Sequence, residues 1–165
     1  MSRAAISAAV DRTALASSVF AHHAAASALP VSPASPLYDG AVAGVNGDKG
    51  AALAALERGT TRTLALVVCN ENAFKLNAAA SIAEALRGYG LAVTVRELSF
   101  ADYCAALAAG KFDLYLGEVA MTADFDPTPL IGTGGSLNYG GYADEETEAL
   151  LSAFRAAGEE ARTAA

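Results

Sequence analysis

The chain has 165 residues and a mass of 16.6 kDa, and 53 % of its residues are hydrophobic. This composition excludes a disordered or fibrous protein, and the length is that of one ordinary domain. A net charge of −7 disfavours contact with a phosphate backbone, so we expect no nucleic-acid partner. No stretch approaches the roughly 20 apolar residues that would cross a bilayer.

The first 22 residues predict a helix rather than a secretion signal. A signal needs an uninterrupted apolar stretch of about 7–15 residues, and Asp11 and Arg12 interrupt this one. Apolar residues instead recur at spacings of four, five and four, which indicates one face of a helix over residues 2–22: Ile6, Val10, Leu15 and Val19.

A proline-rich connector follows this helix. Pro30, Pro33 and Pro36 remove backbone donors, so neither a helix nor a central strand is expected there. A short helix through residues 51–56 is predicted next, with Asp48 as its N-cap and Gly59 at its end.

Strand and helix patterns alternate between residues 64 and 117. Residues 64–69 are a continuous apolar run, which is typical of a strand covered on both faces. Further strands are predicted over residues 91–98 and 112–117. A βαβαβ unit with right-handed crossovers forces a parallel sheet. The predicted fold class is therefore α/β, a three-layer arrangement of a mainly parallel sheet with helices on both faces.

Two predicted helices connect these strands. The first ends at Gly88 and Gly90, and its apolar face comprises Leu76, Ala79, Ile82, Leu86 and Tyr89. The second begins with Ser99 and Asp102, which approximate a capping box, and continues to Gly110. Its buried stripe is predicted to comprise Phe100, Cys104 and Leu107.

Residues 118–142 are predicted to form one long irregular stretch, and loops of this length are commonly functional. Asp144 is predicted to cap a last helix, and residues 159–165 are expected to be a frayed tail. The apolar side of that helix is expected to comprise Leu150, Leu151 and Phe154.

The two cysteines, Cys69 and Cys104, are too far apart in the sequence for a CxxC motif. Because each lies in an apolar element, we expect buried free thiols. An intramolecular disulfide in an oxidising compartment is the alternative.

Motifs for catalysis and cofactor binding fail on their spacing. The cluster at residues 132–135 lacks the third small residue of a dinucleotide fingerprint, because position 137 is Leu137. Lys111 is followed by a phenylalanine, so no phosphate-binding loop forms there. His22 and His23 are adjacent, which favours a surface cap over a metal site. We therefore expect a non-enzymatic protein without a cofactor or metal.

Polar residues follow the first and third predicted strands. Ligands of open parallel sheets sit outside the carboxyl ends of the strands, so residues 70–72 and 118–124 are expected to lie on one rim. The candidate ligand-binding residues are Asn70, Glu71, Asn72, Glu118 and Asp124. Turn formation and helix capping are the alternative for Asn70 and Asn72, and turn formation is the alternative for Asp124 and Asp126.

Several segments, taken in order, resemble the solute-binding proteins of peptide and nickel ABC transporters (extracellular family 5). The resemblance covers nearly the whole chain, and it is carried by several segments in order, together with the proline-rich connector, rather than by any single motif. The segments are residues 5–12, 72–84, 92–95, 102–103, 107–117 and 138–142.

This resemblance implies one lobe of a periplasmic-binding-protein type II fold. Residues 1–165 would be a single α/β lobe, the ligand-binding domain from the C-terminal half of a larger two-lobe receptor. It would capture oligopeptides, dipeptides or related small solutes for import. Its partners would be the missing N-terminal lobe and an ABC permease. The location would be extracytoplasmic, at the periplasm or cell surface, with a lipid anchor on the full-length parent.

The resemblance also assigns residue roles. Asp124 best matches an aspartate that pairs with the α-amino group of a peptide ligand. Val119 stands where relatives commonly have tryptophan, and Glu118 stands where they often have glycine. Glu118 is therefore expected either to add a ligand contact or to cap the end of the strand.

Two alternatives from other functional classes remain at this point. The same βαβ arrangement would suit a small α/β enzyme or a receiver-like regulatory domain, because fold alone does not fix function. A structural alternative is a self-associating chain that exposes an apolar lobe interface.

Overall fold

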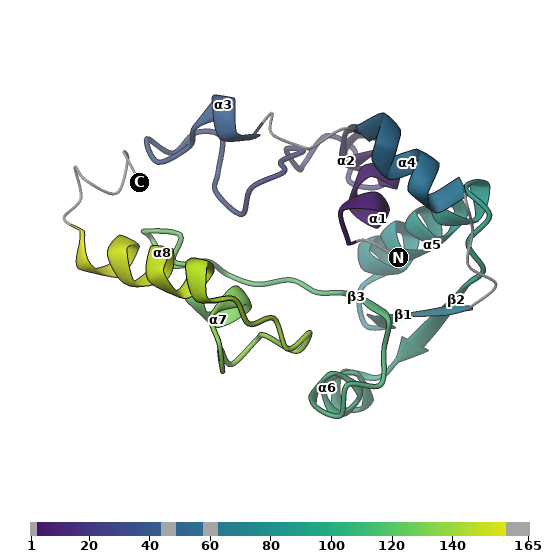
Figure 1. Ribbon diagram of the computed structural model, residues 1–165. Coiled ribbons are helices and arrows are strands. Elements are labelled where there is room, and N and C mark those ends of the chain that lie inside the picture. Colours follow the sequence, from purple (N-terminus) through teal and green to yellow (C-terminus); the bar gives the residue numbers. More distant parts are fainter. Residues whose placement is uncertain (1–2, 44–48, 58–62, 158–165) are drawn as a thin grey trace. The chain divides into compact units, whose positions relative to one another are not determined.

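The computed structural model describes residues 3–43, 49–57 and 63–157 (Figure 1). The chain divides into two compact units. Unit 1 comprises residues 1–26 and 44–118, and unit 2 comprises residues 27–43 and 119–165. Unit 1 contains α1 (Arg3–Ala9), α2 (Arg12–Ser18), α4 (Lys49–Glu57), β1 (Leu64–Cys69), α5 (Ala73–Gly88), β2 (Val93–Leu98), α6 (Phe100–Ala108) and β3 (Leu114–Leu116). Unit 2 contains α3 (Gly40–Ala43), α7 (Thr128–Ile131) and α8 (Glu145–Ala156).

The sheet of unit 1 is parallel, with strand order β2-β1-β3. Leu66 is paired with Val95 of β2 on one side and with Leu114 of β3 on the other. Just before β3, Asp113 reinforces the pairing, because its Oδ2 accepts from the backbone N–H of Ala65 at 2.9 Å. The predicted βαβαβ unit and its parallel sheet are confirmed.

Helices cover both faces of this sheet (Figure 1). The strand order places β2 and β3 on opposite sides of β1, so two right-handed crossovers put α5 and α6 on opposite faces. α1 and α4 pack together beyond α5. The predicted three-layer α/β class is thus confirmed, and its main core comprises Ala5, Ala9, Leu56, Leu64, Leu66, Val68, Ala79, Ala83, Leu86, Leu91 and Val93.

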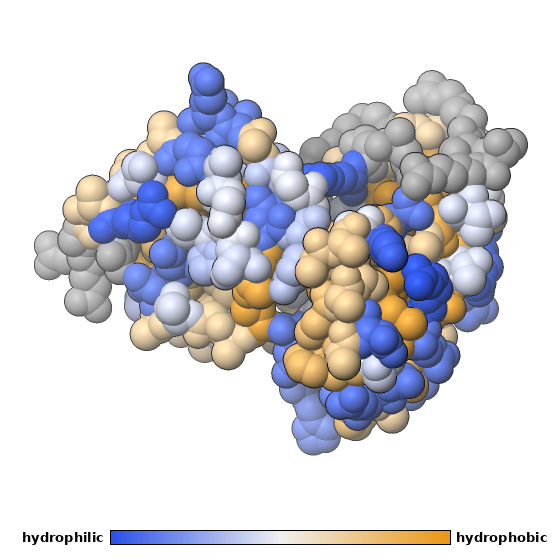
Figure 2. All heavy atoms as spheres, turned by 90° about the horizontal axis from the view of Figure 1, so that it is seen from below, coloured by the Kyte–Doolittle hydropathy of each residue, from blue (hydrophilic) through white to orange (hydrophobic). Residues whose placement is uncertain are grey.

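The residues of α6 that are buried differ from the predicted buried stripe of this helix. Tyr103, Ala106 and Leu107 are buried, and the Tyr103 hydroxyl donates to the carbonyl oxygen of Leu116 at 3.0 Å. Phe100 is 60 % exposed and Cys104 is half-buried. The predicted stripe is therefore wrong for Phe100, the first residue of α6. The exposed apolar residues of α6, which are Phe100, Ala101, Ala105 and Ala108, form part of the apolar surface seen in Figure 2.

The N-terminal segment is two helices, not the single predicted one. α1 ends at Ala9 and α2 begins at Arg12. Asp11 caps α2, since its Oδ1 accepts from the backbone N–H of Ala14 at 2.9 Å. A capping aspartate has extended backbone angles, which interrupts helical hydrogen bonding at this point.

Unit 2 is held by short local networks. The side chain of Asn138 donates to the carbonyl oxygens of Gly132 and Tyr142 and accepts from the Tyr142 N–H. A Cβ on Gly135 would lie 2.6 Å from the Pro129 carbonyl oxygen, so only glycine fits there. The stretch predicted as irregular contains the short helix α7, which is a correction.

α8 begins after Asp144 as predicted, but its apolar side is narrower than expected. Leu151 is buried and Phe154 is half-buried, whereas Leu150 is 61 % exposed. The prediction for Leu150 is therefore wrong. Adjacent residues on a helix point about 100° apart, so a single packed stripe does not bury both leucines.

Three predicted features lie outside the described residues: Asp48, Gly59 and the tail 159–165. Both cysteines are free. No helix in the described part of the chain is long and apolar enough to span a membrane.

Candidate functional site

The carboxyl ends of the three parallel strands meet at one edge of the sheet in unit 1. We call residues 70–75, 99–103 and 117–118, which follow β1, β2 and β3, the carboxyl edge. The prediction that residues 70–72 and Glu118 share this edge is confirmed. Asp124 belongs to unit 2.

Residues 70–72 build the connection from β1 to α5. The backbone N–H of Asn70 donates to the Leu98 carbonyl oxygen at 2.8 Å, and the Asn70 side chain is exposed. Oδ1 of Asn72 accepts from the backbone N–H of Lys75 at 3.1 Å. Asn72 is therefore the N-cap of α5, which confirms the capping alternative.

Glu71 joins two neighbouring loops of the carboxyl edge. Its Oε1 accepts from the backbone N–H of Phe100 at 3.1 Å, at the first residue of α6. A carboxylate there is favoured because the first N–H groups of a helix lack intrahelical partners. Glu71 thus holds the start of α6 near the end of β1.

Glu118 forms an ion pair with Lys75. The Nζ of Lys75 lies 2.7 Å from Oε2 of Glu118. The hydrogen bond from Lys75, together with its positive charge, lowers the pKa of the Glu118 carboxyl. The carboxylate therefore stays ionised at neutral pH.

The aromatic residues of the carboxyl edge were missed by the sequence reasoning. Phe74 is 55 % exposed and stacks on Phe20, with ring centroids 6.1 Å apart. Phe100 is also exposed. Their position directly after strand ends was the available signal. Phe100 was instead predicted to be buried, and Phe74 was not singled out.

Asp124 lies in a tight turn of unit 2. The carbonyl oxygen of Thr122 accepts from the backbone N–H of Phe125 at 2.9 Å, which places Asp124 at a central position of the turn. The side chain of Asp124 is half-buried. Phe125 follows with φ +54°, a left-handed conformation that is uncommon for a bulky residue. The turn therefore fixes the backbone of Asp124 closely.

The neighbouring Asp126 has a structural role. Its Oδ1 accepts from both the backbone N–H and the hydroxyl of Thr128 at the start of α7. Its own N–H donates to Oγ1 of Thr122 at 3.1 Å. The turn-forming alternative is thus confirmed for Asp126.

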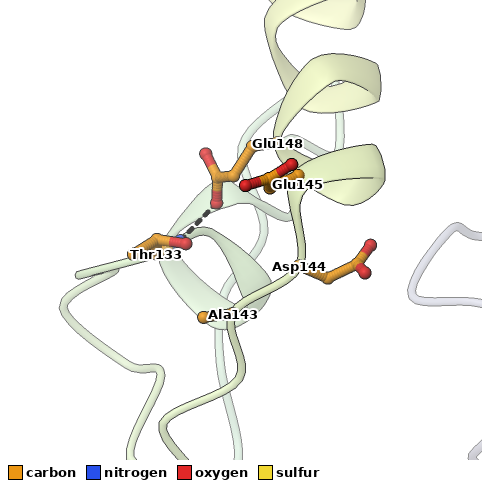
Figure 3. A pocket seen from close by; sticks show the side chains of 5 residues that line it. All are labelled: Thr133, Ala143, Asp144, Glu145 and Glu148. Carbon is orange, nitrogen blue, oxygen red and sulfur yellow. Dashed lines mark hydrogen bonds between the residues drawn. The ribbon is translucent and has the colours of Figure 1, made fainter.

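A separate acidic hollow of about 650 Å³ lies at the start of α8 in unit 2 (Figure 3). Its lining residues are Thr133, Ala143, Asp144, Glu145 and Glu148. The backbone N–H of Thr133 donates to the Glu148 carboxylate and lowers its pKa. Within the described ranges, no group of three or more His, Cys, Asp or Glu side chains is placed to hold a metal ion. None of the predicted ligand-binding residues lines this hollow.

Replacing Asp144 by asparagine is expected to reduce stability at neutral pH but not in acid. Two hydrogen bonds from Thr147 lower the pKa of the Asp144 carboxyl; the one from its backbone N–H has the larger effect and the one from its hydroxyl the smaller. Because the folded pKa lies below the unfolded one, the stabilisation is present above a pH of about 4 and lost as pH falls through the folded pKa. Urea midpoints of both proteins between pH 7 and pH 3 should converge at low pH. A constant difference would contradict this origin.

The chain matches the sequence pattern of the bacterial extracellular solute-binding proteins, family 5 Middle, over residues 2–141. Among curated proteins, none matches it.

Solved structures show the same fold. The oligopeptide-binding protein AppA from Bacillus subtilis, in complex with a nonapeptide, has a TM-score of 0.82 and 17 % identity, with 98 % of this chain and 36 % of that protein covered. The periplasmic oligopeptide-binding protein from Thermotoga maritima has a TM-score of 0.80 and 21 % identity, with 98 % of this chain and 36 % of that protein covered. A second structure of the T. maritima protein, with mannohexaose bound, has a TM-score of 0.80 and 20 % identity, with 97 % of this chain and 36 % of that protein covered.

The chain spans about a third of the length of these proteins. Its α/β architecture is that of one lobe of a type II periplasmic binding protein. With the family pattern matched over residues 2–141, the chain belongs to the bacterial extracellular solute-binding proteins, family 5.

Proposed function

We propose that this chain is the ligand-binding lobe of an ABC-transporter solute-binding protein that captures oligopeptides, dipeptides or related small solutes for import. The observation that carries the proposal is the family match over residues 2–141. Proteins of this family bind solutes for transport and are not a family of enzymes. The nonapeptide-bound B. subtilis relative, which aligns with 98 % of this chain, supports a peptide as the ligand.

The whole receptor would work by hinge closure between two lobes. This chain covers 36 % of the B. subtilis relative, so we assign the rest of the ligand site to an N-terminal lobe. Closure on the ligand would create a shape that an ABC permease distinguishes from the empty receptor. The family is extracellular, and a lipid anchor on the full-length parent would keep the receptor at the membrane surface.

Asp124 is proposed to bind the α-amino group of a peptide. A carboxylate and an ammonium form a charge-assisted hydrogen bond, which is stronger than a neutral one. The tight turn from Thr122 to Phe125 supports this role, since a fixed backbone lowers the entropy cost of presenting the carboxylate.

The carboxyl edge is proposed to supply further ligand contacts through Asn70, Glu71, Asn72 and Glu118. The capping roles of Glu71 and Asn72 each use an oxygen of the side chain. An asparagine side chain also carries an NH₂ group that donates hydrogen bonds, and a carboxylate accepts several. One side chain can therefore cap a helix and contact a ligand.

Calorimetry on the full-length receptor tests this function. The titrants are free dipeptides, tripeptides and nonapeptides, with mannohexaose and nickel–histidine as comparison ligands. We expect at least one peptide to bind with a dissociation constant in the micromolar range or below. Absence of binding across the whole set would contradict a transport-receptor function, and turnover of any of them would point to an enzyme.

The 165-residue chain alone is expected to bind the same peptide far more weakly than the full receptor. One lobe leaves much of the ligand surface in water and offers fewer polar contacts than a closed site. Titration of both proteins with the best peptide from the panel measures the difference. Submicromolar affinity of the isolated chain would contradict the two-lobe account.

A further inference from the structure

One ion pair joins the ends of two neighbouring strands at the carboxyl edge. Nζ of Lys75 lies 2.7 Å from Oε2 of Glu118. Lys75 is in the first turn of α5, just after β1, and Glu118 is the second residue after β3. Because β1 and β3 are adjacent in the sheet, the pair bridges the loops that follow both strands.

The two partners differ in exposure. The Lys75 side chain is 25 % exposed, and the Glu118 side chain is 71 % exposed. The lysine is thus held against the protein, while its carboxylate partner stays open to solvent. Exposed ion pairs contribute little net free energy, so another cation can replace Lys75 on Glu118 at small cost.

The other acidic groups of the carboxyl edge each accept a hydrogen bond from a backbone or hydroxyl donor of the protein. Glu71 accepts from the N–H of Phe100, and Asp102 accepts from the hydroxyl of Ser99 at 2.7 Å. Lys75 is the one cationic side chain among residues 70–75, 99–103 and 117–118, all of which the structure describes. The edge is therefore acidic, and a single lysine offsets one of its three carboxylates.

We propose that Glu118 binds a cationic side chain of the ligand in exchange for Lys75, and that Lys75 sets how strongly the site favours such ligands. The inference rests on the proposed function and deepens it by naming peptides with an arginine or lysine side chain as the favoured class. A guanidinium group suits this exchange, because it can donate two parallel hydrogen bonds to one carboxylate. Lys75 acts as an internal competitor for the same carboxylate.

The test compares two amidated tripeptides, Ala-Arg-Ala and Ala-citrulline-Ala, whose middle side chains have nearly the same shape but carry a charged guanidinium and a neutral urea group respectively. Dissociation constants are measured by amide chemical shifts of the 165-residue chain. The readout is the dissociation constant of the citrulline peptide divided by that of the arginine peptide. Four variants are compared with the wild type: Lys75→Met, Glu118→Gln, the double variant, and Lys111→Met. Lys111 is an exposed lysine of the same unit outside the carboxyl edge, so its variant controls for net charge.

Lys75→Met should raise the ratio about three- to fivefold, the range expected for an exposed ion pair. Glu118→Gln should bring the ratio close to one, and Lys75→Met should then have no further effect. Lys111→Met should leave the ratio unchanged. Equal ratios in all proteins would overturn the inference and leave the proposed function standing. Absence of shifts with either peptide in the wild type would also overturn the inference, whereas the proposed function is tested separately by calorimetry on the full-length receptor.

Discussion

Replacing Asp124 by asparagine is expected to weaken binding of a peptide with a free N-terminus by about 10- to 100-fold. The substitution keeps the size of the side chain and removes its charge. A hydrogen bond to a charged group contributes roughly 1.5–3 kcal/mol, which corresponds to that range of affinity. Calorimetry on the full-length receptor compares the free peptide with the same peptide acetylated at its N-terminus.

The acetylated peptide separates the proposed contact from a general loss of structure. It has no ammonium group, so Asp124→Asn should change its affinity little. Asp126→Asn is the matched control, because the amide oxygen can still accept from Thr128 at the start of α7. Equal losses for both peptides, or an equal effect of the two substitutions, would contradict the role of Asp124.

Replacing Leu86 by alanine is expected to lower the free energy of unfolding by about 2–5 kcal/mol. Leu86 lies in α5, has no exposed surface, and belongs to the core cluster between α5 and the sheet. The loss combines the transfer of the removed methyl groups with the cavity that they leave. Urea denaturation at constant pH measures it.

Glu84→Ala in the same helix is the control for this substitution. Glu84 is exposed, so its replacement should change the free energy of unfolding by no more than about 0.5 kcal/mol. A similar small loss for Leu86→Ala would contradict the packing of α5 on the sheet. Since α5 begins at the carboxyl edge, a severe loss should also perturb the ligand contacts proposed there.

The main fold could be predicted because its signals are local and mutually consistent. The apolar run of β1 needs cover on both faces, and α5 and α6 provide it. Helix caps follow the same logic, since Ser99 and Asp144 accept from nearby N–H groups of their own helices. In contrast, the break at Asp11 could not be read from the apolar spacing, because two short helices and one long helix give similar patterns.

The candidate site was only partly predictable, because it depends on strand order. A βαβαβ sequence is compatible with β3 beside either β1 or β2, and the Lys75–Glu118 pair forms because β3 lies beside β1. The exposure of Phe74 and Phe100 is likewise a property of the three-dimensional packing and not of the apolar pattern. The capping role of Asn72 was among the alternatives, whereas the link from Glu71 to α6 required the three-dimensional arrangement of two loops.

The most direct test of the account is to map peptide binding onto the amide spectrum of the 165-residue chain. The central claim is that this lobe contacts ligand through the carboxyl edge. We predict that the amides of residues 70–75 and Glu118 shift with a common saturation curve. Shifts confined to the acidic hollow at the start of α8, or to the exposed face of α6, would contradict the claim.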